Sequence, residues 1–497
     1  MTGESFGQEK YWVSASTSNW NNAANWASAS GAGGGAGVPL VGDTVIFDAN
    51  GLGRCNIDIS IDVRAIIVQA GFTDSIVQQS GNTINIGPRR AIFNGGTFVG
   101  GDSRIRFEDP FIIDGATFIS TTDTLLPTET VTLTSGSFAA NNGTTVMRFS
   151  STFSGDLSFH KLVFDPTGNR TYVITAGDTV DVQDSLIYTS SNRVRLNTGV
   201  LNVTGDIFLN NTATNCNGST VLMISGASKQ QITSSVPIGQ SELPAFTIAK
   251  TADTAFFDGV ISMEAGIWRY VSGDLNFSRD SGAVAFTTAN TTLIGTHTID
   301  DVILSYVNNG DFDLNPGDTL SVINQLSIIG SNDIDIDGTG AIKLFGDLRL
   351  ENTNQTHNGS STIIFSGAAN QLISSNIGPG ASELCNVVVD KSAGTLTVSD
   401  TISLYRGWKY VAGTTDFLTN SANVFCTYTN AYLTGDENFF NLTIDFVAGG
   451  DLDVNDSALV HGEFRVLGAQ DTDIDGNGAL KLLGDASFET RILGIME

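Results

Sequence analysis

Two acidic phrases are the clearest candidates for chemistry in this chain of 497 residues. The phrase "DIDIDGTG" begins at Asp333, and "DTDIDGNG" begins at Asp471. Aspartates at alternate positions, followed by a glycine turn, are typical of the start of a calcium loop, because Ca²⁺ prefers several oxygen ligands. We expect no cofactor other than a candidate structural Ca²⁺ at these phrases. Its candidate ligands form two sets, which are Asp333, Asp335 and Asp337, and Asp471, Asp473 and Asp475.

The helix-loop-helix form of a calcium loop does not fit either phrase. That form requires a bidentate glutamate at the twelfth loop position, where the chain has Leu344 and Leu482. On a strand, successive side chains point to opposite faces, so Asp335 and Asp337 would face solvent while the isoleucines beside them face the core. A solvated acidic strand face therefore stays open as the alternative to a metal site.

Two tryptophans recur with the same neighbours. Trp268 is followed by Arg269 and a tyrosine, and Trp408 is followed by Lys409 and a tyrosine. Aromatic rings beside cations can bind glycans at a regular spacing, so Trp268 and Trp408 are candidate glycan-binding residues. We favour the other interpretation, in which each indole packs inside the fold between successive coils.

No catalytic motif is present. The chain has no G-x-S-x-G, H-E-x-x-H or phosphate-binding loop. Polysaccharide-cleaving sites usually add a basic residue to paired acids, and the basic residues here are scattered. We predict that the chain is not an enzyme. The four cysteines form no C-x-x-C pair and are expected to be small space-fillers, not zinc ligands or a disulfide framework: Cys55, Cys216, Cys385 and Cys426.

The composition indicates an all-β protein that avoids nucleic acid. Charged residues make up 15% of the chain, whereas Gly (55) and Phe (29) are abundant. The net charge of −28, with no cluster of Lys or Arg to offset it, repels phosphates and anionic membranes. No run of 18 apolar residues occurs, so we expect no membrane insertion. The start "MTGESFGQEKYWV" lacks the features of a signal peptide.

The chain repeats itself with a long period. "DIDGTGAIKLFGDLRL" from Asp335 and "DIDGNGALKLLGDASF" from Asp473 share ten of sixteen residues. "GIWRYVSGDLNF" from Gly266 pairs with "GWKYVAGTTDF" from Gly407 at nearly the same offset. We predict a β-rich segment at 41–204, whose part 151–204 is a partial repeat. Full repeats follow at 205–345 and 346–483, and a third copy begins at 484–497.

Short alternating runs predict the architecture. Runs such as "DFDL", "QLSI" and "AIKL" recur every six to eight residues, and each has the period of a strand with one buried face. They predict an all-β, elongated β-solenoid of the parallel β-helix type, with three strands in each coil of about 20–25 residues and coils about 4.8 Å apart. Tandem β-sandwich modules are the alternative, but those need longer strands and marked hairpin turns.

The first 40 residues differ from the rest. Trp12, Trp20 and Trp26 are three of the five tryptophans in the chain. Spaced aromatics suit a sugar-stacking platform. We favour an N-terminal cap or docking segment over 1–40, because a solenoid must cover its first coil and large aromatic rings bury such an end well.

Two stretches resemble known surface proteins. "KYWV…SNWNNAANW…GAGG…VP…GDTVIFDAN" resembles an N-terminal motif of bacteriophage and bacterial surface proteins. "VVVDKSAGTLTVSDTISL", from Val387 to Leu404, is similar to the repeat element of secreted and viral β-solenoid proteins. The resemblance implies an extracellular or virion-surface protein with a structural, adhesive or fibre role, and it transfers no catalytic residue.

We therefore expect a non-enzymatic structural protein of a virus particle, such as a phage fibre, appendage or decoration subunit. It would be assembled in the host cytoplasm and lie on the virion surface. Expected partners are other virion proteins, further copies in a homo-oligomer such as a trimer, and a host cell-surface glycan. Two alternatives stay open: a secreted bacterial adhesin or surface-layer component at the cell surface, and a polysaccharide-degrading tailspike.

Overall fold

The computed structural model describes residues 7–216, 218–264, 266–288, 290–355, 359–428, 430–446, 449–468 and 472–490. Within them the chain is a parallel β-solenoid of about 19 turns. The one helix among these residues is the short 3-10 helix η1 (Ala23–Asn25). The chain divides into two compact units, Met1–Ala255 (unit 1) and Phe256–Glu497 (unit 2). This division falls inside the segment 205–345, predicted as the first full repeat.

The strands of unit 1 are short, and most hold three to ten residues. In chain order they are β1 (Glu9–Trp12), β2 (Ser18–Asn19), β3 (Trp26–Ala27), β4 (Thr44–Phe47), β5 (Cys55–Ile57), β6 (Ile61–Val63), β7 (Ala65–Val68), β8 (Ser75–Gln78), β9 (Ile84–Ile86), β10 (Ala91–Phe93), β11 (Thr97–Val99), β12 (Ile105–Phe107), β13 (Phe111–Ile119), β14 (Thr124–Pro127), β15 (Val131–Ala139), β16 (Thr144–Met147), β17 (Ser151–Ser154), β18 (Leu157–Phe164), β19 (Arg170–Ile174), β20 (Thr179–Tyr188), β21 (Val194–Asn197), β22 (Val200–Val203), β23 (Asp206–Leu209), β24 (Val221–Gly226), β25 (Gln230–Ser234) and β26 (Ala245–Met263), which begins in this unit.

The strands of unit 2 include several longer ones. They are β27 (Gly266–Phe286), β28 (Thr291–Ile294), β29 (His297–Leu304), β30 (Gly310–Leu314), β31 (Thr319–Gly330), β32 (Ile334–Gly338), β33 (Ala341–Leu344), β34 (Asp347–Asn352), β35 (Thr362–Gly367), β36 (Gln371–Ser375), β37 (Leu384–Val398), β38 (Thr401–Asp416), β39 (Asn423–Cys426), β40 (Asn430–Thr434), β41 (Glu437–Phe439), β42 (Asn441–Ile444), β43 (Gly450–Val454), β44 (Ser457–Val460), β45 (Glu463–Gly468), β46 (Thr472–Asp475), β47 (Ala479–Leu482) and β48 (Asp485–Thr490).

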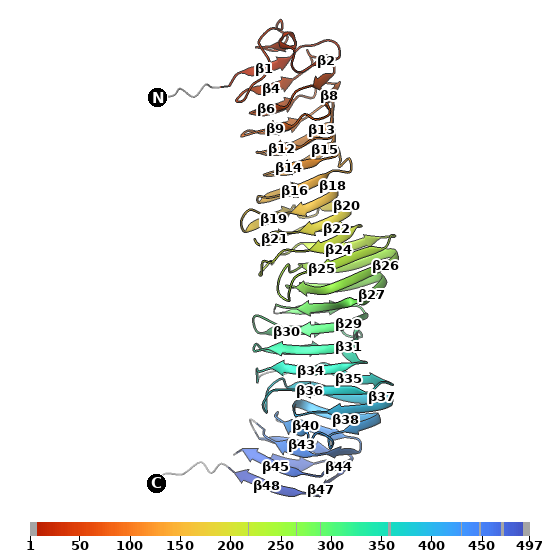
Figure 1. The fold of residues 1–497 in the computed structure, drawn as a ribbon. Coiled ribbons are helices and arrows are strands. Elements are labelled where there is room, and N and C mark those ends of the chain that lie inside the picture. Colours follow the sequence, from red (N-terminus) through yellow and green to blue (C-terminus); the bar gives the residue numbers. More distant parts are fainter. Residues whose placement is uncertain are drawn as a thin grey trace, which may run out of the picture. The chain divides into compact units, whose positions relative to one another are not determined.

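Three strands form one coil in the early turns of unit 1, as predicted. The strands β6, β7 and β8 make one coil, and β9, β10 and β11 make the next. Each strand pairs in parallel with its counterpart one coil later, for example Ile61 with Ile84 and Ile66 with Ala91. Figure 1 shows these strands stacked as successive rungs. The sandwich alternative is wrong, because sandwich sheets are antiparallel.

Some strands bend around a corner of the coil. The first part of β13 pairs with β10, and its last part pairs with β11 on a different face. The register against β15 shifts between Ile113 and Thr117. Gly115 lies at the bend with φ of 99°, a left-handed conformation that glycine adopts without steric cost.

Aromatic side chains stack along the core of unit 1. Phe98 and Phe118 occupy adjacent rungs, with ring centroids 4.6 Å apart and planes 5° apart. Phe107 and Phe111 stack at 4.3 Å. All four side chains are 2% exposed or less. The parallel register thus places one large apolar group over the next and keeps the column dry.

Buried amide side chains satisfy the backbone where the coil turns. Gln230 in unit 1 donates from Nε2 to the Val203 carbonyl at 3.0 Å, and Gln371 in unit 2 donates to the Leu344 carbonyl at 2.9 Å. Both glutamines are almost completely buried. Turn carbonyls that the strand ladders leave unpaired therefore find donors one coil away, as buried polar groups require.

None of the four cysteines forms a disulfide and all four are buried, which confirms their predicted role as space-fillers. Cys385 lies at the start of β37, and Cys426 ends β39. Burial raises the pKa of each of these two thiols to about 12, so both stay protonated at neutral pH.

Three tryptophans close the first rungs of unit 1. The strand β1 pairs in parallel with β4 and antiparallel with β3, so the parallel stack ends there. Trp12, Trp20 and Trp26 are fully buried. The centroid of the Trp26 ring lies 5.1 Å from that of Trp12 and 4.7 Å from that of Trp20. This is the packing that the cap interpretation requires, and it leaves no indole face open to a sugar.

Shortening Trp26 tests this closure. In Trp26→Ala we expect the free energy of opening of the first rungs to fall by about 3–5 kcal/mol, because the lost ring leaves a cavity in the cluster. Amide hydrogen exchange of residues 9–27 measures that opening. Leu40→Ala is the matched control, since Leu40 is 69% exposed. Equal protection in the two variants would show that the indoles do not hold this end closed.

Candidate functional site

The acidic phrase from Asp333 lies on the outside of unit 2. The strands β30 and β32 pair in parallel, with Asp311 opposite Asp335 and Asp313 opposite Asp337. The isoleucines between the acids are 2% and 5% exposed, so the carboxylates point outward as predicted. Like charges in register on adjacent strands destabilise a sheet unless something neutralises them. We call these four residues the aspartate ladder.

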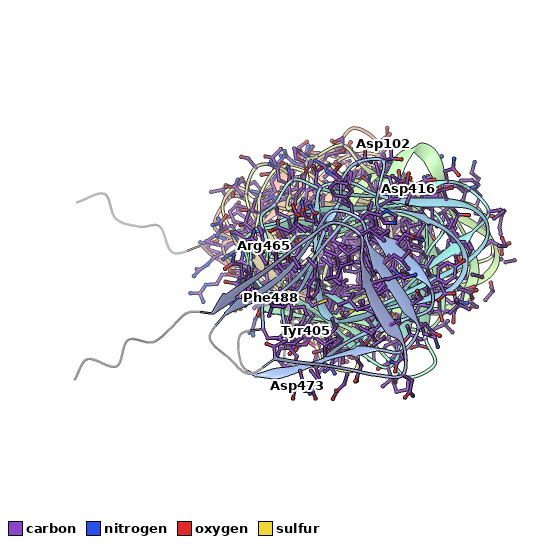
Figure 2. The ribbon with its side chains drawn as sticks, turned by 90° about the horizontal axis from the view of Figure 1, so that it is seen from below. Asp102, Tyr405, Asp416, Arg465, Asp473 and Phe488 are labelled. Carbon is purple, nitrogen blue, oxygen red and sulfur yellow. The ribbon has the colours of Figure 1, made fainter. Side chains whose placement is uncertain are left out.

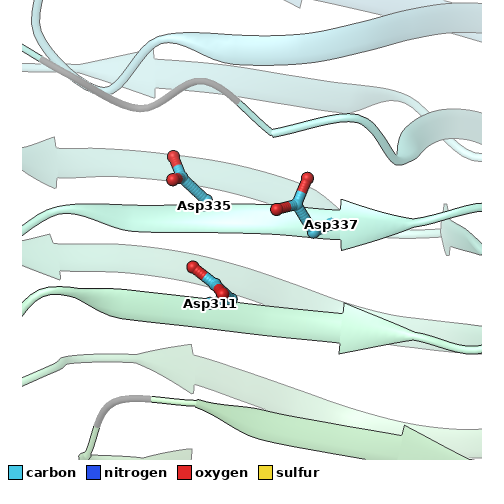
Figure 3. Close-up of side chains that lie close together, drawn as sticks. All are labelled: Asp311, Asp335 and Asp337. Carbon is cyan, nitrogen blue, oxygen red and sulfur yellow. The ribbon is translucent and has the colours of Figure 1, made fainter.

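Three members of the aspartate ladder come together. Carboxylate oxygens of Asp311, Asp335 and Asp337 all lie within 4.8 Å of one another (Figure 3). A Ca²⁺ ion with ligands at 2.3–2.6 Å places opposite oxygens about 4.6–5.2 Å apart, so the spacing suits one ion with waters completing the shell. One carboxylate oxygen of Asp337 also accepts hydrogen bonds from the backbone and hydroxyl of Ser360, each at 2.8 Å.

The structure changes the membership of the predicted set. Asp335 and Asp337 take part, and Asp333 is not in the group. Asp311 was missed, because it lies one coil earlier in the chain. Its signal was "GDFDL" at 310–314, which has the same alternation as the predicted phrase.

The second acidic phrase is arranged more openly. Asp473 and Asp475 are exposed on β46, opposite Asp451 and Asp453. Figure 2 shows Asp473 at the edge of unit 2. Within the part of the chain that the structure describes, no group of three carboxylates meets at this copy. Asp471 lies outside the described residues. The calcium prediction is therefore supported by geometry at the first copy only.

The surroundings of Asp311 and Asp313 in the aspartate ladder raise the pKa of both carboxyl groups. Burial raises the pKa of Asp311, and the charges of Asp337 and Asp333 raise it further. Burial raises the pKa of Glu383 to about 7, although a hydrogen bond with the Thr427 side chain opposes that shift. A proton or a bound cation would relieve this crowding of negative charge.

Neutralising one carboxylate tests the ladder and the metal together. In calcium-free buffer, Asp335→Asn should raise the melting temperature, because removal of one like charge stabilises the pairing by up to about 1 kcal/mol. Added Ca²⁺ should raise the melting temperature of the wild type but not that of the variant. Asp473→Asn is the control and should keep the calcium response. If neither calcium nor a chelator shifts the wild type, the ladder is only a solvated acidic face.

Trp268 and Trp408 pack inside the fold, which confirms the favoured interpretation, and the glycan-binding alternative is wrong. Both indoles are fully buried, so neither offers a ring face to a sugar. Trp268 donates from Nε1 to Nδ1 of His297 at 3.0 Å. Trp408 donates to Oε1 of Glu437 at 2.8 Å. Each acceptor lies 29 residues after its tryptophan in the sequence. His297 and Glu437 therefore occupy equivalent positions in the coil.

Burial lowers the pKa of one acceptor, His297, and raises the pKa of the other, Glu437. It lowers the pKa of His297 to about 4, although a hydrogen bond at Ile294 and the charge of Asp318 oppose the shift. Burial raises the pKa of Glu437, although hydrogen bonds from the side chains of Thr415 and Trp408 oppose that shift. Both shifts favour the neutral side chain, since ions are costly to bury.

The two sites should respond to pH with opposite sign. Below pH 6.5 the unfolded chain protonates His297 but the folded chain does not. Unfolding free energy should therefore fall by at most about 3 kcal/mol as the pH drops from 6.5 to 4. The neutral form of Glu437 stabilises the folded chain fully below pH 4.5. This stabilisation is lost as the pH rises through the elevated pKa of Glu437.

Urea unfolding at a series of pH values measures both effects. In a plot of unfolding free energy against pH, His297→Gln should reduce the slope on the acid side. Glu437→Gln should reduce the slope above pH 4.5. The exposed residue Leu40 supplies the control variant Leu40→Ala, which removes no titratable group and should keep the wild-type dependence on pH. An acid slope that survives in His297→Gln would contradict the assignment.

Arginines gather on the surface of unit 1, which the sequence interpretation missed. Arg64, Arg89 and Arg90 line one groove of about 690 Å³. The expectation that no basic cluster exists is wrong here, because residues one coil apart become neighbours. The available signal was the spacing of 25 residues between Arg64 and Arg89, close to one coil.

Comparison with known proteins adds no relative. No family model matches the chain, and neither a curated protein nor a solved structure matches it. Among the described residues, no helix has the length and apolar character needed to cross a membrane. The functional argument therefore depends on the fold and on the surfaces of the two units.

Proposed function

We propose that the chain is a non-enzymatic structural protein of a virus particle, such as a phage fibre, appendage or decoration subunit. The observation that carries this proposal is the parallel ladder joining rung to rung within each unit. The N-terminal resemblance to phage and bacterial surface proteins supports it. So does the closure of the first rungs by Trp12, Trp20 and Trp26.

The parallel hydrogen bonding between rungs suits a protein that must persist outside a cell. Each inner rung hydrogen-bonds to a rung on both sides, for example β10 to β7 and to β13. A segment held in this way cannot open without breaking the pairing of its neighbours, so local unfolding is costly. Such a framework resists proteases and transmits force along the stack of each unit.

The chemistry of the aspartate ladder fits a structural role better than hydrolysis. A hydrolytic pair needs two carboxyl groups whose surroundings push their pKa values apart. Here burial and neighbouring aspartates raise the pKa of both Asp311 and Asp313. Two carboxyl groups shifted in the same direction are poorly divided into an acid and a base.

The proposed location is the virion surface, after assembly in the host cytoplasm. Other virion proteins, further copies of the chain in an oligomer such as a trimer, and a host-surface glycan are the proposed partners. A secreted adhesin or surface-layer component is the rival within the same fold.

Localisation in purified particles tests the proposal. Antibodies raised against residues 7–216 should label the surface of virus particles in electron micrographs, and the chain should co-purify with those particles through a density gradient. Label confined to the bacterial envelope or the culture medium would favour the adhesin. Release of sugars from bacterial surface polysaccharide by the purified chain would overturn the non-enzymatic part and favour the tailspike.

A further inference from the structure

A groove on unit 1 brings three arginines together. It has a volume of about 690 Å³, and Arg64, Arg89 and Arg90 line it. The Arg89 backbone donates to the Arg64 carbonyl at 3.0 Å, so these two residues stand on adjacent rungs. Arg89 and Arg90 are exposed, and Arg64 is half-buried. We call this surface the arginine groove.

The three guanidinium groups have no anionic partner within the described residues. The ion pairs of unit 1 use Arg106, Arg148 and Lys161 instead. Neighbouring cations without carboxylates at ion-pair distance create a local positive potential in the groove. A ligand with carboxylate groups would match the paired N–H donors of each guanidinium.

The rest of the lining points to a ligand that is also rich in hydroxyl groups. Glu9 and Asp109 add carboxylate acceptors, and Ile67, Pro110 and Ile112 add apolar surface. One oxygen of Glu9 already accepts from the Tyr11 hydroxyl at 2.7 Å. Sugars supply hydroxyl donors for the acceptors and C–H faces for the apolar side chains.

Nucleic acid fits this lining less well. A phosphodiester backbone offers acceptors but no donors for Glu9 and Asp109, and it carries one charge per 1.7 Å of duplex. Residues 1–255 hold 14 basic against 21 acidic residues, a net charge of −7. That background repels a dense polyanion more strongly than a polymer with sparse carboxylates.

A second groove of the same character adjoins the first. It also has a volume of about 690 Å³ and is lined by Arg106, Glu108, Phe149 and Arg170, among others. Glu108 lines this groove, and the next residue in the chain, Asp109, lines the first groove. The Arg170 guanidinium lies 5.3 Å from the centroid of the Phe149 ring, and Arg106 pairs with Glu108 at 3.0 Å. Cations, acceptors and one aromatic face thus continue across successive rungs, as an extended polymer requires.

We infer that the arginine groove of unit 1 binds a segment of an acidic polysaccharide, one whose sugars bear carboxylate groups. The carboxylates pair with Arg64, Arg89 and Arg90, and the sugar hydroxyls donate to Glu9 and Asp109. The polymer continues toward Arg106 and Arg170. This inference names a surface and a ligand class, and it does not require the chain to be a virion component.

Binding of defined polysaccharides by the full chain tests the inference. Polygalacturonate is the acidic probe, dextran is the neutral probe, and a single-stranded oligonucleotide is the competitor. Affinity electrophoresis should show retardation by polygalacturonate that weakens with salt, and little retardation by dextran. Arg89→Gln/Arg90→Gln should weaken binding about tenfold or more, as expected for the loss of charge-assisted hydrogen bonds.

The matched control removes the same charge elsewhere in unit 1. Arg54→Gln/Arg104→Gln should keep the wild-type affinity, because neither arginine lines the groove. Circular dichroism should show both variants folded. Equal binding of dextran, equal loss in both variants, absence of binding, or displacement by the oligonucleotide would each overturn the inference. The location of the chain in virus particles is measured separately, so that proposal stands or fails independently.

Discussion

In-register parallel pairing between rungs is the interaction on which the rest of each unit depends. It fixes the residue that lies over any other, because each backbone hydrogen bond joins a position to its counterpart one coil away. The backbone pairing does not depend on which side chains the paired residues carry. It places Phe98 beside Phe118 in the core, and it also places Asp311 beside Asp335 on the surface.

This constraint has opposite consequences inside and outside the coil. In the core it stacks apolar groups and removes them from water, which stabilises the fold. On the surface it brings like charges to the distance between strands, which destabilises it. The aspartate ladder and the arginine groove are both products of this second effect. The aspartate ladder gathers carboxylates, and the arginine groove gathers three guanidinium groups beside Glu9 and Asp109.

Equivalent positions in unit 2 show that the coil constrains shape and hydrogen bonding more tightly than charge. Trp268 and Trp408 are buried alike, and each indole N–H needs an acceptor. His297 supplies a ring nitrogen, whereas Glu437 supplies a carboxylate oxygen. Either residue satisfies the donor, and each carries its own dependence on pH. The glutamines Gln230 and Gln371, in contrast, keep both residue type and partner position in the two units.

The sequence by itself determined the properties that depend on neighbours along the chain. Alternation predicted the short strands and the outward Asp335 and Asp337, because side-chain direction on a strand follows from local geometry. Only the tertiary structure decided which residues meet across rungs. The step from rung to rung varies, since Thr144 pairs with Lys161 but Leu162 pairs with Leu186. No fixed period therefore locates Asp311 under Asp335, buries the indoles of Trp268 and Trp408, or gathers three arginines in one groove. Those features arise from contacts between distant residues. The alternation at 310–314 and the 25-residue spacing of Arg64 and Arg89 were signals for two of them, but neither fixes which residues pair.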